Sequence, residues 1–485
     1  GNGAVIEYKR TVNEYGTTES STSPNISLSQ AGFFTQCLAN SNATYTVQDL
    51  NFRNVTLKRN CGKDYVTLGV VYARDGAYVA KKLIFSNVTV KNAALDQADW
   101  AGALLGYMSD VKTNNNETIK FENCTVEDFT AGNSDNTISG YKMNHCGALL
   151  GKVEASKATP KKNRKVTFTD CTAKNIKMYK VQNGGLFGGH IVVPCTITGG
   201  SAETGEITSR SNLKGGGYSM GGLVGKTEGL LKVSASKQDT SDEPVTSVNV
   251  KNICINGASD VNTDQESYAG GLAGYAASAD ISDVTVDAAE IAGKNLGGVI
   301  GGVGSASMQN VTVKDSRLAN CKDGREYGRF NVGGLAGTVT GSLKGFNILS
   351  KNNIIGYLIK DGTIQSGGFN STDFETLSET NIGLQLSDET YVAYKNIAND
   401  ASVKADSPCG IWTGNANSNE VKLVSVSHQG AYSAVKNIGS GKKDSSYVIY
   451  ADYTGKAAED SSKISTSPAA AITAGSTALT GDGAA

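Results

Sequence analysis

Residues 221–225 read Gly-Gly-Leu-Val-Gly, and this short pattern returns along the middle of the 485-residue chain. Further copies begin at Gly102 (GALLG), Gly147 (GALLG), Gly184 (GGLFG), Gly270 (GGLAG), Gly297 (GGVIG) and Gly333 (GGLAG). Glycine within a strand marks a bend or a close approach of two backbones. A pattern that repeats in this way indicates similar units stacked along an axis, each of which buries its apolar face against its neighbours.

A second pattern alternates with the glycines, close to one copy of each per unit. It reads apolar–x–Asn/Asp–apolar–x–apolar, as in Phe85-Ser86-Asn87-Val88-Thr89-Val90. Alternation of apolar and polar residues is typical of a strand with one buried face, and Asn and Asp favour turns. We therefore expect one ladder of Asn and Asp side chains at an internal corner, formed by Asn54, Asn87, Asn123, Asp170, Asn252, Asp283 and Asn310.

The two patterns together predict an all-β fold, a right-handed parallel β-helix (β-solenoid) of about nine coils with capping segments. We place the β-helix with its glycine repeats at residues 47–356 and an N-terminal cap at 1–46. Residues 357–455 lose the glycines but stay strand-like, which indicates irregular β coils or a C-terminal β cap. The Ala/Ser/Thr/Gly-rich residues 456–485 have the composition of a linker or of the start of a next module.

Composition and charge exclude several classes of function. Lys+Arg number 45 and Asp+Glu 46, giving a net charge of −1, so the charge balance offers no argument for a nucleic-acid partner. No apolar run reaches the roughly 18 residues of a membrane span, so we expect no membrane insertion within this piece. The three histidines, His145, His190 and His428, are far apart in sequence and form no zinc motif. We expect no cofactor and no metal site.

The cysteines follow the repeat and show no Cys-x-x-Cys motif. Cys124 and Cys171 stand where other units have Val or Ile after the Asn/Asp, and Cys146 stands where others have Met, Leu or Val before the glycine. This indicates free, buried thiols. A disulfide between Cys124 and Cys171 remains an alternative, since the two could lie on adjacent coils.

Aromatic residues precede several glycine copies and are the candidate ligand contacts: Trp100, Tyr218, Tyr268 and Tyr327. Such rings can bind sugars through their apolar faces or can brace neighbouring coils. The ladder positions Asn54, Asn87, Asn123 and Asn310 also begin Asn-x-Thr sequons. We expect their amides to face inward and to be architecture rather than glycosylation sites.

The glycine pattern resembles the GLUG-type repeat of large bacterial surface proteins, adhesins and the non-catalytic regions of some immunoglobulin-A proteases. That resemblance implies a non-catalytic, extracellular segment of a bacterial cell-surface adhesin, acting as a stalk or a ligand-binding module. A host protein or glycan would then be its partner, and the piece would be a monomeric part of a larger chain. The alternatives are a polysaccharide-active β-helix enzyme (a lyase or glycoside hydrolase) and a phage receptor-binding tail-spike part.

Overall fold

The computed structural model describes most of the chain up to residue 357 and short strands beyond it. The described residues are 5–7, 30–37, 43–58, 66–75, 81–96, 98–109, 117–132, 143–155, 164–209, 217–236, 247–257, 267–320, 331–351, 353–357, 359–360, 363–364, 389–391, 409–410, 413–416, 421–429, 431–436, 447–452 and 471–473. Every regular element among them is a strand, and a single sheet takes in 38 of these strands.

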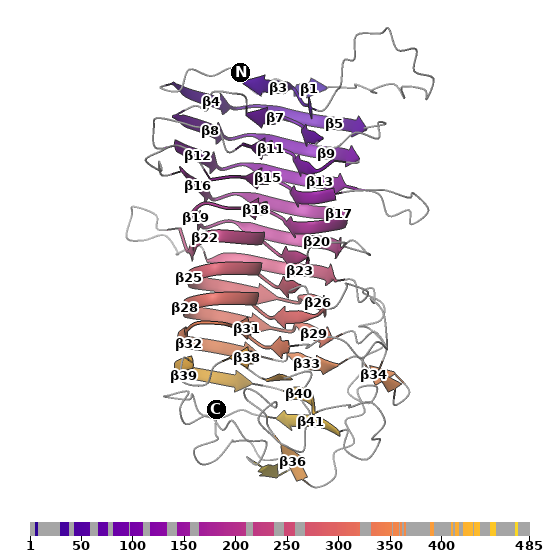
Figure 1. Ribbon diagram of the computed structural model, residues 1–485, viewed down its shortest axis with the longest axis vertical. Helices are drawn as coiled ribbons and strands as arrows, with labels where there is room; N and C mark the ends of the chain where they lie inside the picture. The colour runs from indigo at the N-terminus through magenta and orange to yellow at the C-terminus, as the bar shows by residue number, and fades with distance from the viewer. Residues whose placement is uncertain are drawn as a thin grey trace.

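The chain winds into a parallel β-helix, as the sequence predicts (Figure 1). One coil is made of β10 (Trp100–Gly102), β11 (Leu105–Met108), β12 (Glu117–Glu122) and β13 (Thr125–Ala131). Each of these strands pairs in parallel with the equivalent strand of the coil before and of the coil after. The coil therefore contributes four columns of strands, which we call the first, second, third and fourth columns in chain order.

The two columns that carry the glycine pattern run the length of the stack. The first column contains β2 (Gln30–Ala31), β6 (Thr67–Gly69), β10, β14 (Met143–Gly147), the end of β17 (Thr172–Gly185), β21 (Ser219–Gly221), β24 (Tyr268–Gly270), β27 (Asn295–Gly297), β30 (Asn331–Gly333) and β37 (Cys409–Gly410). The second contains β3 (Phe34–Cys37), β7 (Tyr72–Asp75), β11, β15 (Leu150–Val153), β18 (Gly188–Ile191), the starts of β22 (Val224–Ser234), β25 (Ala273–Asp287) and β28 (Ile300–Lys314), then β31 (Ala336–Val339) and β38 (Thr413–Ala416).

The other two columns carry the apolar–x–Asn/Asp pattern. The third contains β4 (Thr44–Gln48), β8 (Lys82–Ser86), β12, β16 (Arg164–Thr169), β19 (Cys195–Thr198), later parts of β22, β25 and β28, then β32 (Leu343–Lys351) and β39 (Val421–Gln429). The fourth contains β1 (Val5–Glu7), β5 (Asn51–Lys58), β9 (Thr89–Asp96), β13, the start of β17, β20 (Ser201–Ser209), β23 (Val248–Asn256), the ends of β25, β28, β32 and β39, then β26 (Glu290–Gly293), β29 (Arg317–Asn320), β33 (Ile354–Tyr357) and β40 (Ala431–Lys436).

The strands β37, β38 and β39 continue the first three columns at residues 409–429, within the segment for which the sequence indicates irregular coils or a cap. Three antiparallel pairs are also described: β40 with β41 (Tyr447–Asp452), β34 (Ile359–Lys360) with β35 (Thr363–Ile364), and β36 (Glu389–Tyr391) with β42 (Ala471–Thr473). The last of these strands falls in the segment 456–485, for which the sequence indicates a linker or the start of a next module. The β-helix thus extends past residue 356 into strands that follow a long interval of sequence.

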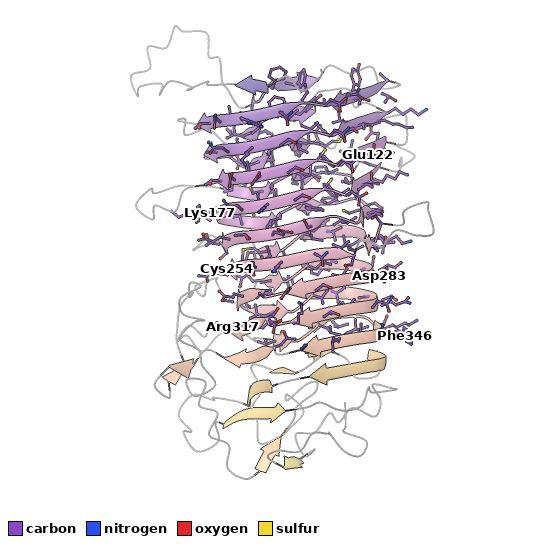
Figure 2. All side chains as sticks on the ribbon, turned by 180° about the vertical axis from the view of Figure 1, so that it is seen from behind. Glu122, Lys177, Cys254, Asp283, Arg317 and Phe346 are labelled. Carbon is purple, nitrogen blue, oxygen red and sulfur yellow. The ribbon has the colours of Figure 1, made fainter. Side chains whose placement is uncertain are left out.

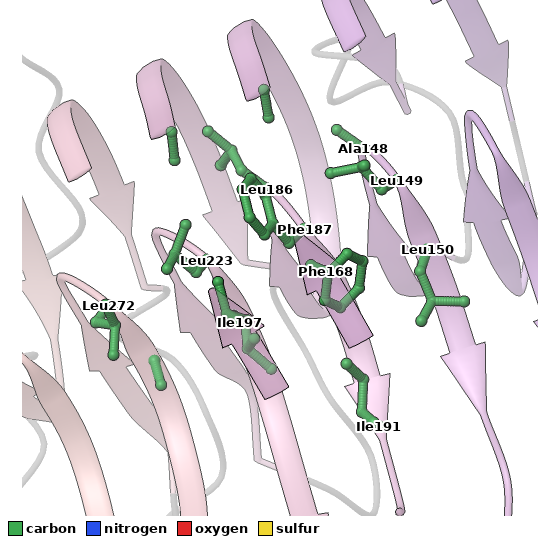
Figure 3. Packing of buried hydrophobic residues seen from close by; sticks show 14 of the residues in the cluster. Ala148, Leu149, Leu150, Phe168, Leu186, Phe187, Ile191, Ile197, Leu223 and Leu272 are labelled. Carbon is green, nitrogen blue, oxygen red and sulfur yellow. The ribbon is translucent and has the colours of Figure 1, made fainter. Parts of the chain in front are cut away.

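The core is a continuous stack of like side chains inside the columns. Phe85, Phe121 and Phe168 lie one above another on successive coils, with ring centroids 5.0 and 4.8 Å apart and nearly parallel planes. Phe187 packs against Phe168 at 5.4 Å (Figure 3). These separations match the spacing of neighbouring strands, so the parallel register itself places each ring over the next.

The glycine pattern forms a tight arch between the first and second columns. The apolar residue at the turn of the arch, such as Leu104 or Leu223, is fully buried, so the turn points into the core. The strands of the arch then lie back to back: a Cβ on Gly225 would come within 2.5 Å of the Gly189 carbonyl oxygen and 2.6 Å of the Gly184 nitrogen. Only glycine fits at such a backbone contact, which explains why the pattern repeats.

The Asn/Asp positions form two ladders rather than one. Between the third and fourth columns stand Asp49, Asn87, Asn123, Asp170, Asp283, Asn310 and Asn347, whereas Asn54, Asn92, Asp128, Asn175, Thr204, Asn252, Ala288 and Asp315 stand at a bend within the fourth column. All have a positive φ of 49–57°, the left-handed conformation that Asn and Asp tolerate best. The expectation of one ladder is therefore wrong.

The side chains of the ladders also face outward, not inward. Asn310 donates from Nδ2 to Oδ1 of Asp283 on the preceding coil, at 2.8 Å, and accepts at its own Oδ1 from Nδ2 of Asn347 at 2.8 Å. Both bonds lie on the exposed surface, as does the 2.6 Å bond from Asn92 Nδ2 to Asn54 Oδ1. Asn and Asp are favoured at the corner because they tolerate the left-handed backbone conformation and can hydrogen-bond to the equivalent side chain on the next coil. Neither property requires the side chain to be buried in the core.

Candidate functional site

A row of rings and basic groups follows the arch. On its second strand Arg74, Tyr107, Lys152, His190, Lys226 and Tyr275 occupy the same register position on six successive coils. Across from them the first strand brings up Trp100, His145 and Tyr268. We call these nine residues the arch row. The side chains of the row meet between the two strands. The row thus brings aromatic rings, imidazoles and cationic groups together in the described part of the molecule.

Three ring pairs bridge the two strands of the arch. Trp100 stacks on Tyr107 with centroids 4.2 Å apart and an angle of 14° between planes. His145 and His190 are 4.9 Å apart at 56°, and Tyr268 and Tyr275 are 5.1 Å apart at 39°. The short arch between the glycines brings residues of opposite strands to ring-contact distance.

The basic groups of the row lie against these rings. The Arg74 guanidinium is 5.3 Å from the centroid of Tyr107, and the Lys226 ammonium is 5.9 Å from that of Tyr275. The Lys152 ammonium is 5.8 Å from the Trp100 ring and forms an ion pair with Glu154. Contacts of this kind are cation–π interactions, so the row alternates charge and π surface along the axis.

The histidine pair is the part of the row that sequence reasoning missed. Asn183 lies 2.8 Å from His145 Nδ1, and Glu228 lies 3.1 Å from His190 Nε2. Burial lowers the pKa of His145 well below the usual range and also lowers the pKa of His190, with the nearby lysines acting in the same direction. The sequence shows two isolated histidines, and only alignment of both to the glycine pattern could have put them on neighbouring rungs.

The aromatic residues singled out from the sequence have different fates. Tyr218 is fully buried, and its hydroxyl accepts a 2.9 Å hydrogen bond from the backbone N–H of Lys294. Tyr268 is 5% exposed. The structure therefore contradicts a ligand-contact role for Tyr218 and leaves Tyr268 almost no free surface. Trp100 is partly exposed at the arch row, and Tyr327 lies outside the described residues.

The cysteines that the structure describes with their side chains are free thiols. Cys124 and Cys171 lie on adjacent coils, both fully buried, and the pKa of Cys124 is lowered chiefly because Cys171 hydrogen-bonds to it. The structure thus has the thiols predicted and not the alternative disulfide. Cys146 and Cys195 are fully buried, and burial raises the pKa of both thiols far above the ordinary range.

The sequon asparagines Asn54, Asn87, Asn123 and Asn310 are exposed, which corrects the expectation that they face inward. Each is followed by a buried apolar residue and then by a Thr on the outer face, as in Asn310-Val311-Thr312. The Asn takes the left-handed corner position, the next residue is apolar because it points into the core, and the third is polar because it points outward. The geometry of the corner therefore accounts for the Asn-x-Thr sequence.

Comparison with known proteins adds no relative, since no family model, no curated protein and no solved structure matches the chain. Within the described residues, His, Cys, Asp and Glu nowhere gather in a group of three or more able to hold a metal ion. The described part also contains no helix with the length and apolarity needed to cross a membrane.

Proposed function

We propose that this chain is a non-catalytic, extracellular β-solenoid segment of a bacterial cell-surface adhesin, which acts as a stalk and presents ligand-binding groups on its flank. The supporting observation is the continuity of the columns, whose parallel pairing runs from β4 to β39 through every coil between them. The third column has ten rungs, so at about 4.8 Å per rung it spans roughly 43 Å.

A stack of this kind suits a stalk because stiffness is built into every rung. Each coil is hydrogen-bonded to two neighbours and shares their core, and the corners add side-chain bonds such as that from Asn87 Nδ2 to Asp49 Oδ1, at 3.1 Å. Bending the rod would break backbone bonds in several columns at once. Such a rod can hold a binding surface at a fixed distance from an envelope.

The arch supports the ligand-presenting part of the proposal. Ser109 and Ala155 follow strands of the second column, whereas Gly217 and Ser267 precede strands of the first. Four insertions of the sequence, at 110–116, 156–163, 210–216 and 258–266, therefore have one end next to the arch, whereas residues 237–246 separate the third and fourth columns. Insertions commonly form the binding side of a solenoid, and partly exposed Trp100 lies next to these four.

The proposal is tested by binding and turnover measured on one preparation. We expect saturable binding to a glycan or host protein on an array, weakened by Trp100→Ala but not by Tyr179→Ala, an aromatic change away from the arch. Incubation with a panel of polysaccharides should release neither reducing ends nor unsaturated sugars. Turnover that an Asp→Ala change abolishes would show a carbohydrate-active enzyme instead, and a stable trimer in solution would favour a tail-spike part.

A further inference from the structure

We propose that His145 and His190 form a binding site for a divalent transition-metal ion, with Zn²⁺ as its probe, which links two successive coils through the arch. The proposal is independent of the adhesin function. It begins from one nitrogen atom: His190 Nδ1 is buried and has no hydrogen-bond partner among the described residues. An orphaned polar atom in a buried side chain is rare and calls for an explanation.

The surroundings of His190 are those of a metal ligand. Its Nε2 lies 3.1 Å from Glu228 Oε1, and a carboxylate at that distance assigns the proton to Nε2. The lone pair is then on Nδ1, the atom without a partner. Metal-binding histidines regularly donate their second ring N–H to a carboxylate in this way, which fixes the tautomer and the orientation of the ring.

His145 supplies a matching nitrogen. Its Nδ1 lies 2.8 Å from Nδ2 of Asn183, so the metal-binding tautomer requires the Asn183 amide to be turned over, with its oxygen toward the ring. An amide can present its oxygen or its nitrogen at such a contact. With the oxygen toward the ring, Nδ1 carries the proton and Nε2 holds the free lone pair. Each imidazole therefore has one nitrogen engaged by a neighbouring coil and one left for a metal ion.

The separation of the rings fits a tetrahedral ion. A Zn–N distance of about 2.05 Å puts each ring centroid about 3.2 Å from the metal. Two imidazoles on a tetrahedral ion then have centroids about 5.2 Å apart, against about 6.4 Å for a linear, two-coordinate ion. The observed 4.9 Å corresponds to the tetrahedral arrangement. Linear cuprous coordination would require the arch to open.

The charges around the pair are balanced. Lys152 and Lys226 occupy the rungs on either side of His190. Lys152 forms an ion pair with Glu154, and Lys226 with Glu228 at 2.9 Å. Each ammonium is thus offset by a carboxylate, and Glu228 also contacts His190. A divalent ion would not face an uncompensated positive cluster.

Two protein ligands leave two coordination positions for water or for an oxygen of a bound molecule. We therefore expect micromolar rather than nanomolar affinity, since structural zinc sites close all four positions with protein groups. Partly exposed His145 provides the route from solvent. The ion would bridge β14 of one coil and β18 of the next, so binding should raise the temperature of unfolding.

The experiment titrates Zn²⁺ by calorimetry, and Co²⁺ by visible absorption, into protein first treated with a chelator. We expect one equivalent to bind and Co²⁺ to give the intense d–d bands of a tetrahedral site. His145→Asn and His190→Gln should each weaken binding at least tenfold. His428→Gln, the matched change at the remaining histidine, should leave it unaltered. Binding that survives the His145→Asn/His190→Gln double variant would overturn the proposal.

The unmodified protein gives a second readout that does not depend on the folding of any variant. X-ray absorption of the Zn²⁺-loaded protein should show two imidazole ligands and oxygen in the remaining positions, and its midpoint of thermal unfolding should rise with Zn²⁺ concentration. Absence of both the imidazole signal and the thermal shift at millimolar Zn²⁺ would refute the site.

Discussion

Arg164 and Glu117 form an ion pair between two successive coils with 1% and 0% of their side chains exposed. Arg164 also donates from Nη1 to the carbonyl oxygens of Ser109 and Glu154, each at 2.6 Å. Ser109 and Glu154 follow the second-column strands of the same two coils. One guanidinium therefore ties together the ends of two second-column strands on successive coils and the start of β16.

We expect Arg164→Met to cost about 3–5 kcal/mol of unfolding free energy, because it leaves the Glu117 carboxylate buried without a counter-charge. The double variant Glu117→Leu/Arg164→Met should recover most of that loss. Lys120→Met is the matched control, since the Lys120–Glu122 pair is 39% and 30% exposed and such pairs contribute less than about 1 kcal/mol. Denaturant unfolding followed by circular dichroism measures the stability of all three variants. Equal losses for Arg164→Met and Lys120→Met would show that the buried Arg164–Glu117 ion pair matters no more than an exposed one.

The bend of the fourth column offers a stabilising change at Ala288. Its φ is +50°, where the ladder elsewhere has Asn, Asp or Thr, and a non-glycine residue in this conformation costs about 1–2 kcal/mol. Ala288→Gly should therefore raise the free energy of unfolding by about 1 kcal/mol, and Ala288→Asn should do so partly. Ala279→Gly, at a buried strand position, should lower it. A loss of stability in Ala288→Gly would show that this corner is not strained.

The arch glycines should be intolerant of a methyl group in proportion to what that group meets. In Gly225→Ala the new Cβ meets backbone at 2.5–2.6 Å, which cannot move without breaking columns. Gly205 of β20, in the fourth column, is the comparison: in Gly205→Ala the new Cβ meets the ends of the Ile253 and Leu186 side chains at 3.0 Å, which can turn aside. We expect Gly225→Ala to lower the unfolding midpoint far more than Gly205→Ala, or to prevent folding. Similar midpoints for the two variants would mean that the strands of the arch can separate.

The fold can be predicted from the sequence because each coil is specified by residues close together in the chain. Glycines that repeat with Gly221, and apolar residues that alternate around Asn87, suffice to predict parallel stacking. The same pattern misleads at the corners: Asn54 and Asn87 have equivalent neighbours in sequence but stand at different bends, since each bend needs a left-handed residue before an inward apolar one.

The arch row could not be predicted in the same way. Insertions of unequal length separate the coils, so the distance in sequence between His145 and His190 does not reveal that they share a contact. Burial of Tyr218 was equally hidden, because a Tyr before a glycine copy can turn toward the core or toward solvent. These contacts depend on which residues of neighbouring coils lie opposite one another. That pairing is known only once the strands of each column have been aligned.

Cys254 lies on the outer face of the fourth column (Figure 2). Glu206 and Glu290 stand directly opposite it in register on the two neighbouring coils. Burial, and then the charges of Glu290 and Glu206, raise the pKa of its thiol to about 12. Because an unfolded thiol ionises near 9 while the folded one stays protonated, this group stabilises the fold below pH 9. That contribution is lost as the pH rises from 9 toward 12.

We expect Cys254 in the folded protein to react with iodoacetamide at pH 8 about a thousandfold more slowly than an ordinary thiol, since only the thiolate attacks. Its rate should climb about tenfold per pH unit beyond pH 9, without a plateau before about 12. Glu206→Gln/Glu290→Gln should speed the reaction several-fold at pH 8 but not fully, because burial is the larger cause. Asp280→Asn, which removes a carboxylate from the third column, should change nothing. Peptide mapping by mass spectrometry isolates the rate at Cys254. A plateau near pH 9 would show that neither burial nor the glutamates raises the pKa of this thiol, and an unchanged rate in the double variant would show that the glutamates do not act on it.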